Sequence, residues 1–466
     1  MTDWWRDDLP ALQRQLAGPT FVAETQGYDE EVAVFNEALK HTPAVVVGAT
    51  TAADVVNAVN FASHHGMDIA VLNTGHGPAV SAGPTSLMVT TKRMSKIEVD
   101  AQAATARVEA GVRFGQLVEA TVPFGLAPLP GSSPGVGVVG YTLSGGASST
   151  MGRRYGWAAD HVSAIEVVTA DGLLRRVTAE SEADLFSAML GGKGNYGIVT
   201  AMEFGLFPVT RLYAGALFYS GEHIKDVLNA YRRFTATAPE DVSTSLAIFN
   251  LPPLPHLPPF MQGKLALSLR VSYLGDEAEG ARLIEPLRQA APVLLDTVAD
   301  MPYSQFASIS GDPTDPAAAV EHFGLLRELT EDAVDAIVDA AGPTAPSRVN
   351  IFDIRHLEGA YGKPPTFPNA VGARDAAFAF FALTVVPPGH DIANYRDSGR
   401  ELAEALSPWL HDMASPTFQG PADATPSGTR RAYEPDTYER LRVAKSKYDP
   451  FNRFRNNHNI LPAASI

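Results

Sequence analysis

The most regular hydrophobic pattern lies near the start of the chain. A strand is predicted by the valine-rich run PAVVVGA (43–49). A helix is predicted after the capping box TAAD (51–54), because apolar residues follow at helical spacing until Gly66. A second strand is predicted by DIAVL (68–72). A strand, a helix and a strand in this order predict a βαβ unit with parallel strands.

The pattern changes beyond about residue 210. Amphipathic helices are predicted at 223–239 and 277–292, and an alternating, half-buried strand at 264–274. A polar crossing with several prolines follows at 415–428, and a last helix is predicted at 437–448. Helices mixed with alternating strands predict an α+β fold with a second domain in the middle of the chain.

Composition narrows the class of protein. The chain has 466 residues, 52 acidic against 36 basic residues and a net charge of −16, and no Lys/Arg cluster suggests a nucleic-acid surface. It has no cysteine, which excludes disulfides, thiolate nucleophiles and cysteine metal sites. No apolar run reaches about 18 residues, and no signal peptide is recognisable, so a cytoplasmic protein that does not enter membranes is expected. The histidines show no metal-ligand spacing, so no metal site is expected.

One histidine stands in a suggestive place. His76 lies between two glycines, directly after the predicted strand at 68–72. Loops at the carboxyl ends of parallel strands commonly hold ligands. Thr74, Gly75 and Gly77 allow a tight bend with exposed N–H groups, which suits a phosphate. From the residues alone, His76 is either a ligand contact or a polar turn residue.

A glycine-rich segment at 131–146 has six glycines among sixteen residues and is predicted to be a loop pressed against a ligand. It contains the literal pattern G-x-G-x-x-G at 135–140. Prolines precede that pattern and glycines follow it, which disfavours the strand and helix of a nicotinamide-binding unit. It also contains G-x-S-x-G at 131–135, where Pro134 disfavours the tight turn of a hydrolase.

Four segments in order resemble the berberine-bridge-enzyme-like family, which belongs to the flavin oxidoreductases with the PCMH-type, or vanillyl-alcohol-oxidase, FAD-binding fold. They are the Gly-His of the loop at 75–76; VGVVGYTLSGG (136–146) with RYG (154–156) and AD (159–160); GGKGNYGIVT (191–200); and YDPFNRFR (448–455) with NHNI (457–460). The resemblance covers nearly the whole chain.

The resemblance implies a two-domain α+β fold. Residues 1–205 would bind FAD, residues 206–418 would form a substrate domain with an antiparallel sheet covered by helices, and residues 419–466 would return to the FAD domain. The implied enzyme oxidises a C–H bond next to an alcohol or amine of a small molecule by hydride transfer to flavin N5, with O2 as the expected acceptor. The sequence indicates neither the substrate nor the oligomeric state.

By the same resemblance, His76 bonds covalently to the 8α-methyl group of the flavin. Doubly tethered relatives carry a cysteine where this chain has Ser133, so a single histidyl tether is expected. The expected cofactor contacts lie in the four segments and their flanks. They are Asn73, Thr74, Gly75, His76, Gly77, Pro78, Ser81, Gly131, Ser132, Ser133, Gly137, Val138, Gly140, Tyr141, Gly145, Gly146, Gly197, Ile198, Val199, Asn457 and Asn459.

The catalytic base is the weakest part of the match. Relatives often carry Tyr-x-Asn before the last helix, where this chain has SPT (415–417). Tyr141 is the preferred replacement, since the glycine-rich segment should bring it near the flavin. Other candidates are, as tyrosines, Tyr196, Tyr433 and Tyr438 and, as helping cations, Arg154, Arg355 and His356.

Three alternatives stay open. The first is a non-covalent FAD dehydrogenase of the same fold, and the second is a flavin-binding protein without redox turnover. The third is a nicotinamide enzyme, which would show no visible absorbance.

Overall fold

The computed structural model describes residues 4–77, 79–255, 257–345 and 349–463. Its first sheet has the order β1 (Thr20–Phe21), β2 (Val45–Gly48), β4 (Ser86–Thr90), β3 (Asp68–Leu72). The predicted βαβ unit is confirmed in its elements, but β2 and β3 do not touch, because β4 lies between them and is parallel to both. The crossover helix α3 (Ala52–His64) begins at the predicted capping box.

A second, antiparallel sheet completes the first half of the molecule. Its order is β5 (Ile97–Asp100), β6 (Thr105–Glu109), β9 (Gly197–Gly205), β7 (Val162–Thr169), β8 (Leu174–Val177). Helix α3 packs against both sheets, and Val168 and Ile198 of the second sheet share its core. Helix α3 therefore joins the two sheets of the first half through a shared core.

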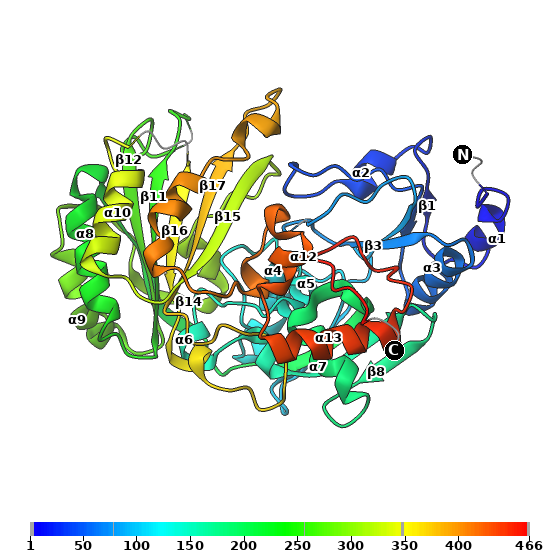
Figure 1. The fold of residues 1–466 in the computed structure, drawn as a ribbon. Helices are drawn as coiled ribbons and strands as arrows, with labels where there is room; N and C mark the ends of the chain where they lie inside the picture. Colours follow the sequence, from blue (N-terminus) through cyan, green and yellow to red (C-terminus); the bar gives the residue numbers. More distant parts are fainter. Residues whose placement is uncertain (1–3, 78, 256, 346–348, 464–466) are drawn as a thin grey trace.

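The middle of the chain forms a separate antiparallel sheet. Its order is β13 (Val293–Asp296), β10 (Arg211–Ser220), β12 (Leu265–Tyr273), β11 (Val242–Asn250), β16 (Ile351–His356), β17 (Phe378–Val385), β15 (Ala319–Leu326), and β14 (Ala299–Pro302) also pairs with β10. Figure 1 shows helices α8 (Ile224–Thr235), α9 (Glu277–Arg288) and α10 (Glu331–Ala341) on its outer side. The predicted antiparallel sheet covered by helices is confirmed, and β15 is the strand nearest the first half.

The expectation of a loop is wrong for part of the glycine-rich segment. Helix α5 (Val138–Leu143) forms there, because Val138, Val139 and Leu143 are buried in the main core at helical spacing. Helix α7 (Ala183–Gly192) likewise runs into the next glycine run. The elements directly before α5 are helix α4 (Phe114–Thr121) and a 3-10 turn (Val122–Phe124), so the nicotinamide-binding pattern still lacks its first strand.

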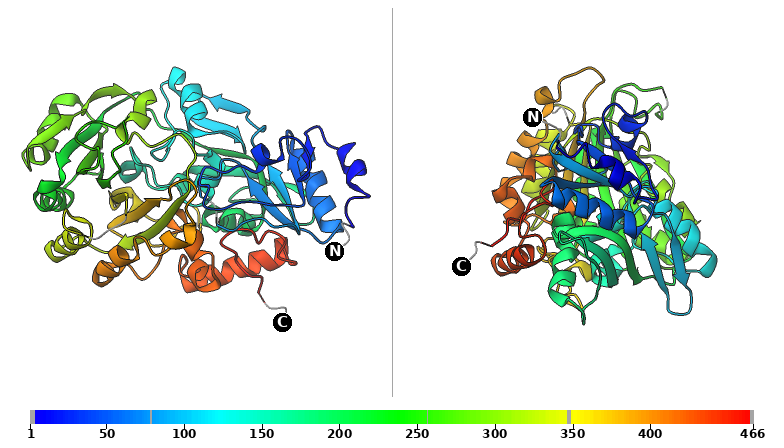
Figure 2. Two further views of the ribbon diagram at one scale, coloured as in Figure 1. Left: turned by 90° about the horizontal axis from the view of Figure 1, so that it is seen from above. Right: turned by 90° about the vertical axis from the view of Figure 1, so that its right-hand side faces the viewer.

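The C-terminal segment packs onto the first half of the molecule. Helix α13 (Pro435–Tyr448) lies against α7, and the backbone N–H of Ile69 on β3 donates to the Arg453 carbonyl. The three views place both ends of the chain on the same half (Figures 1 and 2). Across the described residues, no helix has the length and apolar character needed to cross a bilayer.

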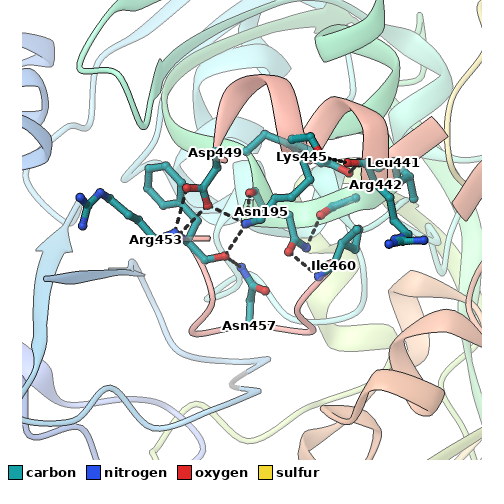
Figure 3. A network of polar contacts seen from close by, with 12 residues as sticks. Asn195, Leu441, Arg442, Lys445, Asp449, Arg453, Asn457 and Ile460 are labelled. Carbon is teal, nitrogen blue, oxygen red and sulfur yellow. Dashed lines mark hydrogen bonds and ion pairs between the residues drawn. The ribbon is translucent and has the colours of Figure 1, made fainter. Parts of the chain in front are cut away.

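A buried polar network anchors this segment (Figure 3). Lys445 Nζ donates to Asp449 Oδ2 at 2.7 Å, to the Asn195 carbonyl at 2.7 Å and to the Phe454 carbonyl at 3.0 Å. The Asn195 side chain donates to the His458 carbonyl and accepts from the Ile460 N–H. The tail is therefore tied to the glycine run at 191–197, and residues 456–458 are held at a fixed place beside it.

Candidate active site

A cavity of about 440 Å³ lies where these pieces meet. Its wall is built by the loop after β3, by α5, by β15, by the short segment 416–420 and by the C-terminal tail. Several expected cofactor residues line it: Asn73, Thr74, Gly75, His76, Gly77, Gly137, Gly140, Tyr141, Gly197, Val199 and Asn457. The structure therefore brings the four family segments together around one space.

Other expected residues do not line this cavity. They are Ser81, Gly131, Ser132, Ser133, Val138, Gly145, Gly146, Ile198 and Asn459, and Pro78 lies outside the described residues. Val138 and Ile198 pack in the hydrophobic cores instead, and Ile198 lies on β9 between Gly197 and Val199, which do line the cavity. An ideal Cβ on Gly146 would lie 2.7 Å from the Tyr141 ring, so this glycine makes room for Tyr141.

His76 is held in a defined orientation. Gly75 has φ +68, and an ideal Cβ there would lie 2.5 Å from Val34 Cβ, so the turn requires glycine. The imidazole stacks on Phe35 with ring centroids 3.9 Å apart and an interplanar angle of 8°. Its Nδ1 lies 2.9 Å from Thr74 Oγ1, whereas its buried Nε2 has no hydrogen-bond partner. One ring nitrogen is therefore left without a hydrogen bond.

The electrostatic surroundings keep this imidazole neutral. Burial, helped by the nearby positive charge of Arg113, lowers the pKa of His76 to about 4, although Asp312 acts in the opposite direction. A neutral imidazole keeps a nucleophilic lone pair at neutral pH. His76 can therefore form a bond to an electrophilic carbon without first losing a proton.

Tyr141 reaches the cavity but is not prepared as a base. Its hydroxyl oxygen is buried without a hydrogen-bond partner, and its ring meets Phe114 edge-on at 4.9 Å. Burial raises the pKa of Tyr141 well above its ordinary value, and the positive charge of Arg355 opposes this only in part. The hydroxyl is therefore protonated at neutral pH and can donate a hydrogen bond.

The other candidates for the base do not line the cavity. Tyr196 and Tyr433 donate their hydroxyls to main-chain carbonyls in the main core, where Tyr438 is also buried. Of the helping cations, Arg154 pairs with Asp241 and Arg355 with Asp353, and His356 Nε2 lies 2.6 Å from Glu358 Oε2. Of these three contacts, the one between Arg154 and Asp241 joins the two halves of the molecule.

Three residues that line the cavity, Lys193, Gln419 and His458, have no role in the sequence analysis. Lys193 has φ 58, unusual for a residue other than glycine, and its Nζ lies 3.3 Å from Gln419 Oε1 and 3.1 Å from His458 Nδ1. Burial lowers the pKa of Lys193 to about 7 and that of His458 to about 3. The signal for Lys193 is its place inside the glycine run at 191–197, where a positive φ is normally adopted by glycine.

The cavity leaves polar atoms that a ligand can satisfy. Besides His76 Nε2 and Tyr141 Oη, the side-chain oxygens of Asn73 and Asn457 are buried without a partner. Unpaired buried polar groups each cost about 1–3 kcal/mol. An elongated cofactor with a polar edge, such as FAD, would pair with them, so the residues present fit this group. Asn459 Oδ1 is also unpaired but lies outside the lining.

One group of metal-binding type lies elsewhere. Ligand atoms of Asp8, His64 and His65 lie within 4.8 Å of one another in the described part of the chain. None of them lines the cavity, and Asp8 and His64 are exposed.

Two family models match this chain. The model described as FAD binding domain matches residues 43–178, and the model described as berberine and berberine like matches residues 420–461. The chain is a berberine-bridge-enzyme-like FAD-linked oxidoreductase. The two matched regions supply the His76 loop, α5 and the tail, which face each other across the cavity.

Characterised relatives of this oxidoreductase span its whole length. The (R)-6-hydroxynicotine oxidase of Paenarthrobacter nicotinovorans is 24% identical, covering 98% of this chain and 99% of its own. Among solved structures, the carbohydrate oxidase of Microdochium nivale superimposes with a TM-score of 0.84 at 21% identity, covering 98% and 99% of the two chains. The 6-hydroxy-D-nicotine oxidase of Arthrobacter nicotinovorans gives a TM-score of 0.83 at 23% identity, covering 96% and 98%. These structures share the fold.

Proposed function

We propose that this oxidoreductase carries FAD bonded covalently to His76 and oxidises a C–H bond next to an alcohol or amine of a small molecule. The observation that carries this proposal is the state of His76. Its imidazole stacks on Phe35 and contacts Thr74 Oγ1, and its buried Nε2 has no hydrogen-bond partner, at the wall of the cavity that the other family segments also line. The lack of cysteine leaves one tether, through this histidine.

The remaining cofactor contacts are proposed from the cavity wall. Residues 1–205 and 419–466 would hold the FAD, with Asn73, Tyr141 and Asn457 pairing its polar edges. Residues 206–418 would shape the substrate side, where Phe323 and Thr417 line the cavity. Bound FAD supplies the hydride acceptor, its N5 atom, and O2 is the proposed final acceptor.

The substrate is proposed to be a small molecule with a secondary amine or hydroxyl group. This is supported by the names of similar proteins, which include hydroxynicotine oxidases, a carbohydrate oxidase and a xylooligosaccharide oxidase with bound xylobiose. Since one fold serves many chemistries, the choice between amine and sugar depends on the side chains of the middle domain.

Anaerobic reduction tests this function. The purified, yellow enzyme is mixed without oxygen with 6-hydroxynicotine, cellobiose, xylobiose, chitobiose, benzyl alcohol and a cyclic secondary amine. Loss of flavin absorbance with one of them, followed by recovery and hydrogen peroxide when air is admitted, is the expected result. Recovery only with an artificial dye would indicate a dehydrogenase. No bleaching by any compound would contradict the proposal and favour a flavin-binding protein without turnover.

A further inference from the structure

A carboxylate faces the cavity from the middle domain. Glu321 lies on β15, and with Phe323, two residues along the strand, it lines the cavity. Among the described lining residues it is the one acidic side chain. The main-chain carbonyl of Glu321 lies near Gly420, so this part of β15 abuts the segment 416–420.

Asn36 fixes the position of this carboxylate. Its Nδ2 donates to Glu321 Oε2 at 3.3 Å and to the Ala319 carbonyl at 3.1 Å, and its Oδ1 accepts from the Ala319 N–H at 3.1 Å. The main-chain N–H of Asn36 also donates to the Gly75 carbonyl at 3.2 Å. One residue therefore joins the flavin-tether loop to the strand that carries Glu321.

The neighbour of Asn36 completes this connection. Phe35 stacks on His76, and its N–H donates to the Thr74 carbonyl at 3.0 Å. The pair Phe35–Asn36 thus contacts His76 with one residue and Glu321 with the next. Through these two adjacent residues, the loop that carries His76 is linked to β15, which carries Glu321.

We infer that Glu321 is the catalytic base, which takes the proton from the O–H or N–H group of the substrate. The inference rests on the proposed function and replaces Tyr141 in this role. The O–H or N–H bond breaks and its proton moves to the carboxylate, while the C–H electron pair leaves as hydride to FAD and a C=O or C=N bond forms. Reoxidation passes two electrons to O2, and with two protons, one of them from Glu321, gives hydrogen peroxide.

The surroundings of Glu321 suit this task. Burial raises the pKa of Glu321 to about 7, and the hydrogen bond from Asn36 opposes the rise only in part. A base titrating near neutral pH is well matched to proton transfer. The other titratable groups on the cavity wall are His41, His76, Tyr141, Lys193 and His458, and none of them forms an ion pair with Glu321 in the described structure.

The variant Glu321→Gln tests the inference. It keeps the shape of the side chain and removes the proton acceptor, so the rate of anaerobic flavin reduction by the substrate identified above should fall about 10²–10⁴-fold. The wild-type rate should rise with pH through about 7, and this rise should vanish in the variant. Glu328→Gln, the same change at an exposed position just after β15, serves as the matched control. A Glu321→Gln rate near that of wild type, with the same pH profile, would overturn the inference.

Two further measurements separate the possible failures. Acid-precipitated Glu321→Gln protein should keep its yellow colour, because attachment depends on His76; a loss of flavin from both this variant and wild type would count against the proposed function instead. Without any substrate, the visible flavin spectrum should titrate near pH 7 in wild type and in Lys193→Met, but not in Glu321→Gln. A titration that disappears in Lys193→Met and survives in Glu321→Gln would assign the ionisation to Lys193 and overturn the role of Glu321.

Discussion

The imidazole of His76 lies flat against the ring of Phe35, with centroids 3.9 Å apart and an interplanar angle of 8°. The stack fixes the plane of the ring, and Thr74 Oγ1, 2.9 Å from Nδ1, fixes its rotation. His76 is thus oriented before any cofactor is bonded to it. Pre-orientation of this kind favours a bond-forming reaction because little freedom remains to be lost.

Replacing Phe35 with alanine should slow flavin attachment without abolishing it. An aromatic pair contributes about 0.5–1.5 kcal/mol beyond burial, so the loss of orientation is expected to be partial. The measurement is the acid-stable flavin formed over time after FAD is mixed with protein purified without it. Phe35→Tyr, which keeps the stack, is the control and should behave as wild type. Equal rates for all three proteins would show that the stack does not assist attachment.

Ser133→Cys should create a second attachment point. An ideal Cβ on Gly135 would lie 3.7 Å from Ser133 Oγ and 3.6 Å from His76 Cε1, so Ser133 and His76 flank the same glycine. In a His76→Ala background, Ser133→Cys should restore acid-stable flavin, found by mass spectrometry on the peptide that contains residue 133. Ser132→Cys in the same background is the control. Failure to recover any flavin on position 133 would argue against its equivalence to the cysteine of doubly tethered relatives.

Lys445→Met should destabilise the protein strongly. All three ammonium hydrogens of Lys445 are bonded, and the substitution leaves Asp449 as an uncompensated buried carboxylate. Breaking a buried pair typically costs about 3–5 kcal/mol of unfolding free energy. Urea unfolding of the holoenzyme measures the loss. Lys447→Met, which breaks the exposed pair with Asp184, should change little, and similar losses in both variants would contradict this account of Figure 3.

Stability should depend on pH through Glu321. Its pKa in the folded protein is raised to about 7, so between its ordinary value of 4.5 and about 7 the folded state binds more protons than the unfolded state. Stability from this group is therefore present at low pH and lost as the pH rises through about 7. The melting temperature of Glu321→Gln, measured relative to that of wild type, should therefore rise from pH 5 to pH 8. A constant difference over that range would show that Glu321 titrates normally.

The local features of this fold could be read from the sequence. The capping box at Thr51 begins α3, and the strand before His76 ends where the apolar run ends. Helix α5 was missed because burial of Val138, Val139 and Leu143 in the core outweighs the low helix propensity of the glycines around them.

The residues on the substrate side of the site could not be predicted from local sequence patterns. Glu321 carries no motif, and it reaches the cavity through the pairing of β15 with β17 and its contact with Asn36, both long-range features. The cavity position of Lys193 could not be predicted for a different reason. Its backbone has the left-handed conformation that glycine normally adopts, so the residue type does not indicate the turn.

Acid precipitation shows whether His76 carries the flavin. The purified protein is denatured with acid, and flavin absorbance is recorded in the pellet and in the supernatant, with His76→Ala treated in parallel. If His76 is the attachment site, yellow colour is expected in the wild-type pellet and in the supernatant of the variant. Flavin released from wild type would contradict the covalent bond, and flavin kept in the His76→Ala pellet would contradict the attachment site.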